Sequence, residues 1–166
     1  MPATMASLDP STFRAALGRF ASGVTVLTLR TPDGTDLGMT ATAFSSVSLT
    51  PPLILVCVDV EASAAPALRV GTPFAVHLLA EGQTALSRRF ASSEGDRFAD
   101  LAVARGEDDV LRLDGTLAHL ACRVHATYPG GDHLIVVGAV RDATIAESAP
   151  LLYFRGAYGG FTPAAG

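Results

Sequence analysis

Residues 38–52 read GMTATAFSSVSLTPP, and this stretch decides the fold that the rest of the sequence predicts. Side chains alternate between the two faces of a β-strand. One face would carry small hydroxyls and a ring, from Thr40, Thr42, Phe44, Ser46, Ser48 and Thr50. The other face would be mostly small and apolar, from Met39, Ala41, Ala43, Ser45, Val47 and Leu49. We expect a kink or bulge near Ala43–Ser46 and the end of the ladder at Pro51-Pro52.

The hydroxyl face has two interpretations. Serine and threonine are ordinary residues on a half-exposed strand, so the row can be purely structural. Alternatively, it is the floor of a groove, where small side chains let a flat aromatic ligand approach the backbone and hydroxyls bind its polar edge.

The flanking sequence predicts further strands and short helices. Asp9-Pro10 starts a helix whose apolar residues, among them Phe13 and Leu17, recur at helical spacing, and Gly23 ends it. We expect short helices at 63–71, capped by Ser63, and at 82–91, and weak structure over 92–115. Strands are expected at 24–30, 53–60, 74–79, 116–128, from 133 onward and at 150–158. This pattern predicts a mainly β fold, an antiparallel barrel with a few short flanking helices.

Composition limits the classes of protein. The 166 residues suit one domain, with a core over about 10–161 and flexible termini. Half of the residues are hydrophobic (49%) and only 17% are charged, which suggests a buried oligomer interface. The net charge of −4 and the lack of a basic block argue against nucleic acid and anionic membranes as partners. The apolar runs are too short to span a bilayer, and the N-terminus does not resemble a secretion signal.

Cysteine and histidine give no metal-binding pattern. Cys57 and Cys122 each lie within an apolar run, which indicates buried thiols in a reducing cytoplasm. His77, His119 and His125 form no set with metal-ligand spacing, so no metal site is expected.

Three further patches carry candidate site residues. Ser63 lies at a predicted helix start and can simply cap it, and Arg88-Arg89 can simply be solvated charges. Alternatively, the helix start and the two arginines together bind a phosphate. The sequence GGDH at 130–133 is a hairpin turn, or it places His133 at the rim of the barrel beside a ligand. The sequence YFRGAY at 153–158 packs in a core or a dimer, or its Arg155 and Tyr158 cover a ligand.

Together, these patches resemble the short-chain flavin reductases, which have the FMN-binding split-barrel fold and are the reductase components of two-component flavin-dependent monooxygenases. The resemblance runs from about Phe13 to Phe161, and GMTATAFSSVSLTPPLILVCV at 38–58 is its most specific block. The other blocks are FRAALGRFASGVTVLT, FAVHLLAEGQTALSRRFA, GDHLIVVGAV and PLLYFRGAY. One departure is His77, where many relatives have Asn, which questions ligand contacts from that strand.

The resemblance implies a role for each matching residue. The flavin ring would contact Thr40, Ala41, Thr42, Ala43, Ser45 and Ser46. The ribityl and phosphate portion would border Val58, Asp59 and Ser63, and Arg89, Phe90 and Ala91 would close the phosphate end. The nicotinamide would lie near His133, and the pyridine nucleotide or the outer ring face near Arg155, Gly156 and Tyr158.

The implied activity is hydride transfer from NADH or NADPH to FMN or FAD, with reduced flavin passing to a partner monooxygenase. Such an enzyme needs no catalytic dyad, because the cofactor carries the difficult step. The resemblance also implies a homodimer. Two alternatives stay open: a flavoprotein with tightly bound flavin that acts as an electron carrier or tailoring oxidoreductase, and a non-catalytic flavin-binding module. The sequence distinguishes neither FMN from FAD nor NADH from NADPH.

Overall fold

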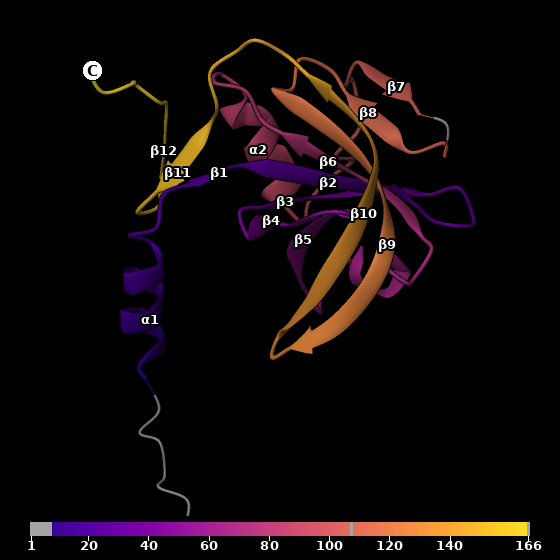
Figure 1. The fold of residues 1–166 in the computed structure, drawn as a ribbon, viewed down its shortest axis with the longest axis horizontal. Helices are drawn as coiled ribbons and strands as arrows, with labels where there is room; N and C mark the ends of the chain where they lie inside the picture. The colour runs from indigo at the N-terminus through magenta and orange to yellow at the C-terminus, as the bar shows by residue number, and fades with distance from the viewer. Residues whose placement is uncertain (1–7, 107, 166) are drawn as a thin grey trace, which may run out of the picture.

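Antiparallel strands dominate the computed structural model, which describes residues 8–106 and 108–165 (Figure 1). The predicted flexible N-terminus falls on residues 1–7, outside the described residues. The first half of the chain forms α1 (Pro10–Leu17), β1 (Ser22–Gly23), β2 (Thr25–Arg30), β3 (Asp36–Ala41), β4 (Phe44–Leu49), β5 (Pro52–Asp59), the 3-10 helix η1 (Ala65–Ala67) and β6 (Pro73–Leu78). The second half forms α2 (Thr84–Ala91), β7 (Val103–Arg105), β8 (Leu111–Leu113), β9 (Ala118–Gly130), β10 (His133–Ile145), β11 (Leu152–Phe154) and β12 (Ala157–Gly159). The predicted mainly β, antiparallel fold with short flanking helices is confirmed.

The main sheet has seven strands in the order β3-β2-β6-β9-β10-β5-β4. Its two edge strands, β3 and β4, are consecutive in the chain and are linked only by Thr42 and Ala43. The sheet must therefore curl until its edges meet at this corner. The β4-β5 ladder extends into the corner, where Cys57 N–H donates to Ala43 O at 3.0 Å. The kink predicted near Ala43–Ser46 is present as this corner and as a register shift between Ser46 and Ser48.

The faces predicted for residues 38–52 hold before the corner and reverse after it. In β3, Ala41 and Met39 pack on the core, as expected. In β4, Phe44 also packs on that core, while Ser45, Val47 and Leu49 are exposed. The single hydroxyl face that included Phe44 is therefore wrong, because the corner turns the strand over.

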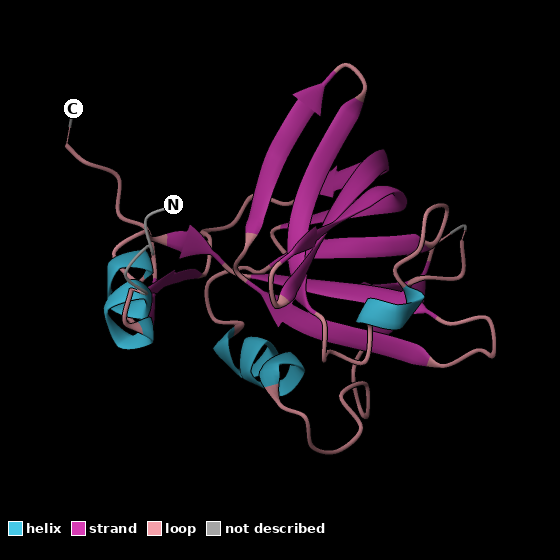
Figure 2. Ribbon diagram, turned by 90° about the horizontal axis from the view of Figure 1, so that it is seen from below, coloured by secondary structure: helices cyan, strands magenta, loops and turns pink. Residues whose placement is uncertain are grey.

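The core lies inside the curled sheet, and a second apolar layer lies outside it. Leu27 and Leu29 of β2 face the inner core, while Val24 and Val26 pack outward. The outer layer is completed by Phe90 of α2, which lies outside the sheet (Figure 2), and by Leu113 of β8. Strand β2 is thus covered on both faces, which explains its continuous apolar sequence.

Three local predictions are corrected. Helix α1 ends at Leu17 instead of reaching Gly23. Ser63 lies before η1, and Ala64 holds the N-cap position. The 92–115 segment contains the antiparallel pair β7 and β8, whose Leu111 and Leu113 are buried. Alternating apolar residues 111 and 113 were the signal of this strand.

Helix α1 projects from the body of the molecule beside the small sheet β1-β11-β12 (Figure 1). Asp9 caps it by accepting from Thr12 N–H at 2.9 Å, as the sequence predicted. All eight residues of α1 are exposed. Of the helices in the described ranges, none combines the length and the apolar character needed to cross a membrane.

Candidate functional site

The corner between β3 and β4 presents a small-residue surface. Thr42, Ala43, Ser45 and Ser46 are exposed there, whereas Ala41 is buried and offers only its backbone. A cavity of about 320 Å³ adjoins the corner, and Thr42 and Phe44 line it together with Phe20 and Leu151. The corner therefore combines exposed hydroxyls, of which that of Ser45 donates to Ser46 O at 3.0 Å, with little side-chain bulk, which suits the close approach of a flat ring.

Helix α2 is hydrogen-bonded both to β3, which leads into the corner, and to the C-terminal strand β12. The Thr40 hydroxyl donates to Ser87 O at 2.6 Å, and the Ser87 hydroxyl lies 2.9 Å from the Tyr158 hydroxyl. The Arg88 guanidinium lies 5.7 Å from the centre of the Tyr158 ring. Thr40 and Tyr158, predicted to serve different parts of the site, are thus brought together, although the Thr40 hydroxyl is already engaged.

Gly38 allows α2, which carries the residues predicted to bind the flavin phosphate, to pack closely on β3. A methyl group at this position would lie 2.5 Å from Phe90 Cε1, so only glycine lets α2 pack this close to β3. The Phe90 ring is 1% exposed and meets Phe98 edge-on at 5.1 Å, so the side chain supports α2 and a ligand can reach only the Phe90 backbone. Arg89 and Ala91 are exposed, and one Arg89 nitrogen donates to Ala99 O at 2.7 Å.

Ser63 faces this region across a cavity of about 190 Å³. The opposite wall is the segment after α2, from Ser93 to Phe98. Arg97 holds this segment to the sheet by donating to Gly38 O at 2.6 Å. The sequence did not predict four residues of this region, which are Gly38, Ser87, Arg97 and Phe98. Two signals were present: a glycine at the start of the stretch 38–52, and an Arg-Phe pair in an otherwise polar segment.

The end of β5 and the start of β10 form the next part of the predicted site. Val58 is fully buried in the core, so a ligand can reach only its backbone. Asp59 is exposed and pairs in register with His133. His133 Nδ1 lies 2.7 Å from an Asp132 carboxylate oxygen, and this hydrogen bond lowers the pKa of Asp132. His133 is thus oriented by its neighbour at the rim.

Arg155 and Gly156 form the turn between β11 and β12 in left-handed conformations, with φ of +52° and +81°. The Arg155 N–H donates to Gly18 O at 3.0 Å, which ties this turn to the end of α1. Figures 1 and 2 both show the turn between β9 and β10, where His133 lies, well away from the β11-β12 sheet. One chain therefore does not bring together His133 and the Arg155–Tyr158 segment, which were predicted around the nicotinamide.

His77 is not a site residue in this structure. It is fully buried, its Nδ1 lies 3.0 Å from Val26 O, and its Nε2 accepts from Leu113 N–H at 3.2 Å. Burial lowers its pKa from 6.5 to about 3, so the ring is neutral. His77, which departs from the family pattern, therefore bonds to the outer layer through Val26 and Leu113 and makes no hydrogen bond with the described residues of the corner.

Comparison with known proteins identifies the family. The model of the flavin reductase like domain matches residues 17–162. The chain is 46% identical over 147 residues to the reductase component of 4-hydroxyphenylacetate 3-monooxygenase from Thermus thermophilus, covering 88% of this chain and 93% of that protein. It is 43% identical over 150 residues to the FMN reductase (NADH) SmoA of Agrobacterium fabrum, covering 90% and 85% of the two chains.

A solved structure agrees with the sequence comparisons. The NADH:FAD oxidoreductase SgcE6 of Streptomyces globisporus, in complex with NAD and FAD fragments, superposes with a TM-score of 0.88 at 38% identity. The match covers 97% of this chain and all of that one (100%). The protein belongs to the flavin reductase like family.

Proposed function

We propose that this protein is an NAD(P)H-dependent flavin reductase that transfers a hydride to FMN or FAD and supplies the reduced flavin to a partner monooxygenase. Its relatives include the reductase component of a 4-hydroxyphenylacetate monooxygenase and an NADH-dependent FMN reductase. The observation that carries the proposal is the corner at Thr42–Ser46, because it offers hydroxyls and backbone to a flat ring with few bulky side chains in the way.

The protein's contribution to this reaction is binding and orientation. Bound flavin would supply the hydride acceptor, and the nicotinamide the donor. Thr42, Ala43, Ser45 and Ser46 would hold the ring, and Asp59, Ser63, Arg89 and the segment 93–98 would border the ribityl phosphate. His133, oriented by Asp132, would position the nicotinamide. Fixing two rings in contact supplies much of the rate enhancement in such transfers.

The test of the activity is oxidation of NADH and of NADPH with and without added FMN or FAD. We expect oxidation that requires added flavin and saturates with it. Flavin that stays with the protein through gel filtration would instead indicate a flavoprotein with a tight cofactor. A folded protein that oxidises neither nucleotide with either flavin would refute the proposal.

The site itself is tested by Ala43→Leu. Since Ala43 is exposed, the larger side chain leaves the core intact and occupies the space of the ring. We expect the KM for flavin to rise at least tenfold. The matched control is Ala143→Leu on an exposed position of β10, away from the corner. Equal KM values for the two variants would remove the corner from the site.

We also propose that the protein is a homodimer. Phe13 and Leu17 of α1 are 52% and 57% exposed, and Phe20 beyond it is 79% exposed. A helix of eight residues is marginal by itself in water, so this apolar face needs a partner. A second copy would also bring a further set of site residues near His133 or Arg155, which lie apart in one chain.

The dimer is tested by sedimentation equilibrium of Leu17→Glu, with Ala15→Glu on the opposite face of α1 as the control. We expect a charge at Leu17 to weaken association strongly and the control to remain dimeric. A wild-type protein that is monomeric at micromolar concentration would contradict the proposal.

A cytoplasmic location is part of the same proposal. Both Cys57 and Cys122 are free thiols in the described structure, which fits a reducing compartment.

A further inference from the structure

A further cavity lies on the other side of the sheet from the barrel core, under the β7-β8 hairpin. Its volume is about 470 Å³, within the ~300–1,000 Å³ that small-molecule sites usually have. The polar part of its lining includes Arg112, His119, Arg141 and Asp142, and Val110 and Ala121 belong to the apolar part. None of the residues proposed for flavin or nicotinamide binding lines it.

A β-bulge builds one wall of this cavity. Val140 pairs with Cys122 and Asp142 pairs with Ala121, so Arg141 is an extra residue in β10. On a regular strand, neighbouring side chains point to opposite faces, yet Arg141 and Asp142 both line the cavity. Bulges of this kind redirect side chains and occur frequently beside functional sites.

His119 lies on β9, the strand next to β10 in the sheet, and it lines the same cavity with an unsatisfied polar atom on its ring. The residue is 7% exposed, and its Nδ1 is buried without a hydrogen-bond partner among the described residues. Burial of a polar atom without a partner costs free energy, so such atoms usually mark a function or a missing partner. The neighbouring ring of His77, 5.1 Å away, is already bonded on both nitrogens.

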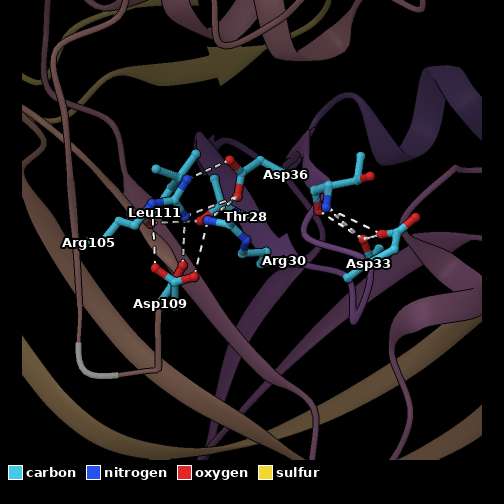
Figure 3. Close-up of polar contacts among 9 residues, drawn as sticks. Thr28, Arg30, Asp33, Asp36, Arg105, Asp109 and Leu111 are labelled. Atoms are coloured by element: carbon cyan, nitrogen blue, oxygen red, sulfur yellow. Dashed lines mark hydrogen bonds and ion pairs between the residues drawn. The ribbon is translucent and has the colours of Figure 1, made fainter.

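The cavity has cationic groups that the protein leaves available. Arg105, at its edge, is committed to Asp36 and Asp109, and its ion pair with Asp36 of β3 holds the hairpin to the main sheet (Figure 3). Asp108 is paired with Arg123. Arg112 uses one nitrogen to donate to Thr144 Oγ1 at 2.9 Å. The Arg141 side chain makes no hydrogen bond or ion pair with any described residue.

We propose that this cavity binds a small aromatic carboxylate, with its charged group between Arg141, Arg112 and His119 and its ring on the apolar surface that includes Val110 and Ala121. Guanidinium groups bind carboxylates through paired, charge-assisted hydrogen bonds. The site lies outside the proposed flavin corner, which is formed by Thr42–Ser46, and it does not depend on the proposed reductase activity.

Proton uptake by His119 accompanies binding. Burial, followed by the Arg112 charge, lowers the pKa of His119, and Asp142 opposes this effect. The groups that face this ring are His77 on β6, Arg112 on β8, and Arg141 and Asp142 on β10. A bound carboxylate adds a negative charge and raises the His119 pKa, so affinity increases as the pH falls through this pKa.

The experiment is an NMR titration of the His119 ring with benzoate, with benzamide and acetate as neutral and ring-free probes. The signal is assigned with His119→Gln. We expect benzoate to bind and to raise the His119 pKa, benzamide to leave that pKa unchanged, and acetate to bind at least tenfold more weakly. Arg141→Gln should weaken benzoate binding at least tenfold, about 1.4 kcal/mol, without changing flavin-dependent NADH oxidation. The matched control is Arg69→Gln, at an exposed arginine outside the cavity lining.

The titration is repeated with saturating FMN. Benzoate binding that persists supports a separate site, and displacement by FMN overturns the proposal. A His119 signal that does not respond to benzoate, or equal benzoate affinity in Arg141→Gln and Arg69→Gln, also overturns it. The benzoate titrations require no reductase activity, so failure of this proposal is distinguishable from failure of the proposed function.

Discussion

Replacing Gly38 by alanine tests how tightly α2 packs on β3, the strand that leads into the proposed flavin corner. The added methyl group would lie 2.5 and 2.7 Å from two carbons of the Phe90 ring and 3.0 Å from Phe98. Phe90 is 1% exposed, so the ring cannot swing into solvent and α2 must move away from β3. Overpacking of this kind costs about 1–3 kcal/mol.

For a chain of this length, each kcal/mol lowers Tm by ~2–4 °C, so Gly38→Ala should lower Tm by about 2–12 °C in thermal unfolding followed by circular dichroism. The KM for flavin should rise as well, because the displaced helix carries Arg89. Gly159→Ala is the matched control, since a methyl group there meets no described atom within 4 Å. Adding Phe90→Leu to Gly38→Ala should restore part of the loss, because the smaller side chain relieves the contact. A Gly38→Ala protein as stable as the Gly159→Ala protein would refute the close packing of α2 on β3.

Three other expectations address the outer layer and the core. Because the His77 pKa is lowered from 6.5 to about 3, the unfolded chain binds this proton first as the pH falls, and stability decreases from pH 6.5 downward. Between pH 7 and pH 5 the wild-type free energy of unfolding should decrease, and His77→Gln should remove up to about 2 kcal/mol of this decrease in urea unfolding. An equal decrease in the variant would contradict the lowered pKa of His77. Burial raises the pKa of Cys122 to about 12, so a disulfide reagent should reach this thiol only after unfolding, and labelling in the native protein would disprove its burial. Asp36→Asn should accelerate amide exchange in the β7-β8 hairpin at low salt, since it removes the partner of Arg105; rates equal to the wild type would show that other contacts hold the hairpin.

Much of the fold was predictable because its signals are local. The Asp9 cap, the strand before Arg30 and the break near Ala43 follow from capping, β-branching and the clustering of small residues. The reversal of faces after the corner was not predictable, because it arises when the two edges of the sheet meet, which no local pattern encodes. The role of Ser87 was equally hidden, since a serine in a helix gives no sign of a tertiary hydrogen bond to Tyr158.

In the candidate site, too, the sequence predicts features with local signals and does not predict those that arise from tertiary packing. The exposed corner residues, such as Thr42 and Ser45, lie in the segment that the sequence singled out. Phe90 also lies in one of the blocks that resemble the family, but its side chain has a supporting position. Because Gly38 has no side chain, the Phe90 ring packs against it in the outer apolar layer. Periodicity and resemblance find the segments of a site, whereas the division between contact and support depends on what packs behind them.

The outer layer packs between the proposed flavin corner and the cavity under the β7-β8 hairpin. Strand β2 is covered by the barrel core on one face and by Phe90 and Leu113 on the other, so α2 and β8 pack on the same strand. Helix α2 borders the flavin corner through Thr40 and Ser87, and β8 borders the hairpin cavity through Arg112. His77 Nε2 bonds to Leu113 of β8 and stands beside His119. The two proposed sites therefore share the packed groups of the outer layer, because His77 contacts His119 and bonds to β8, and β8 packs on the same strand as α2.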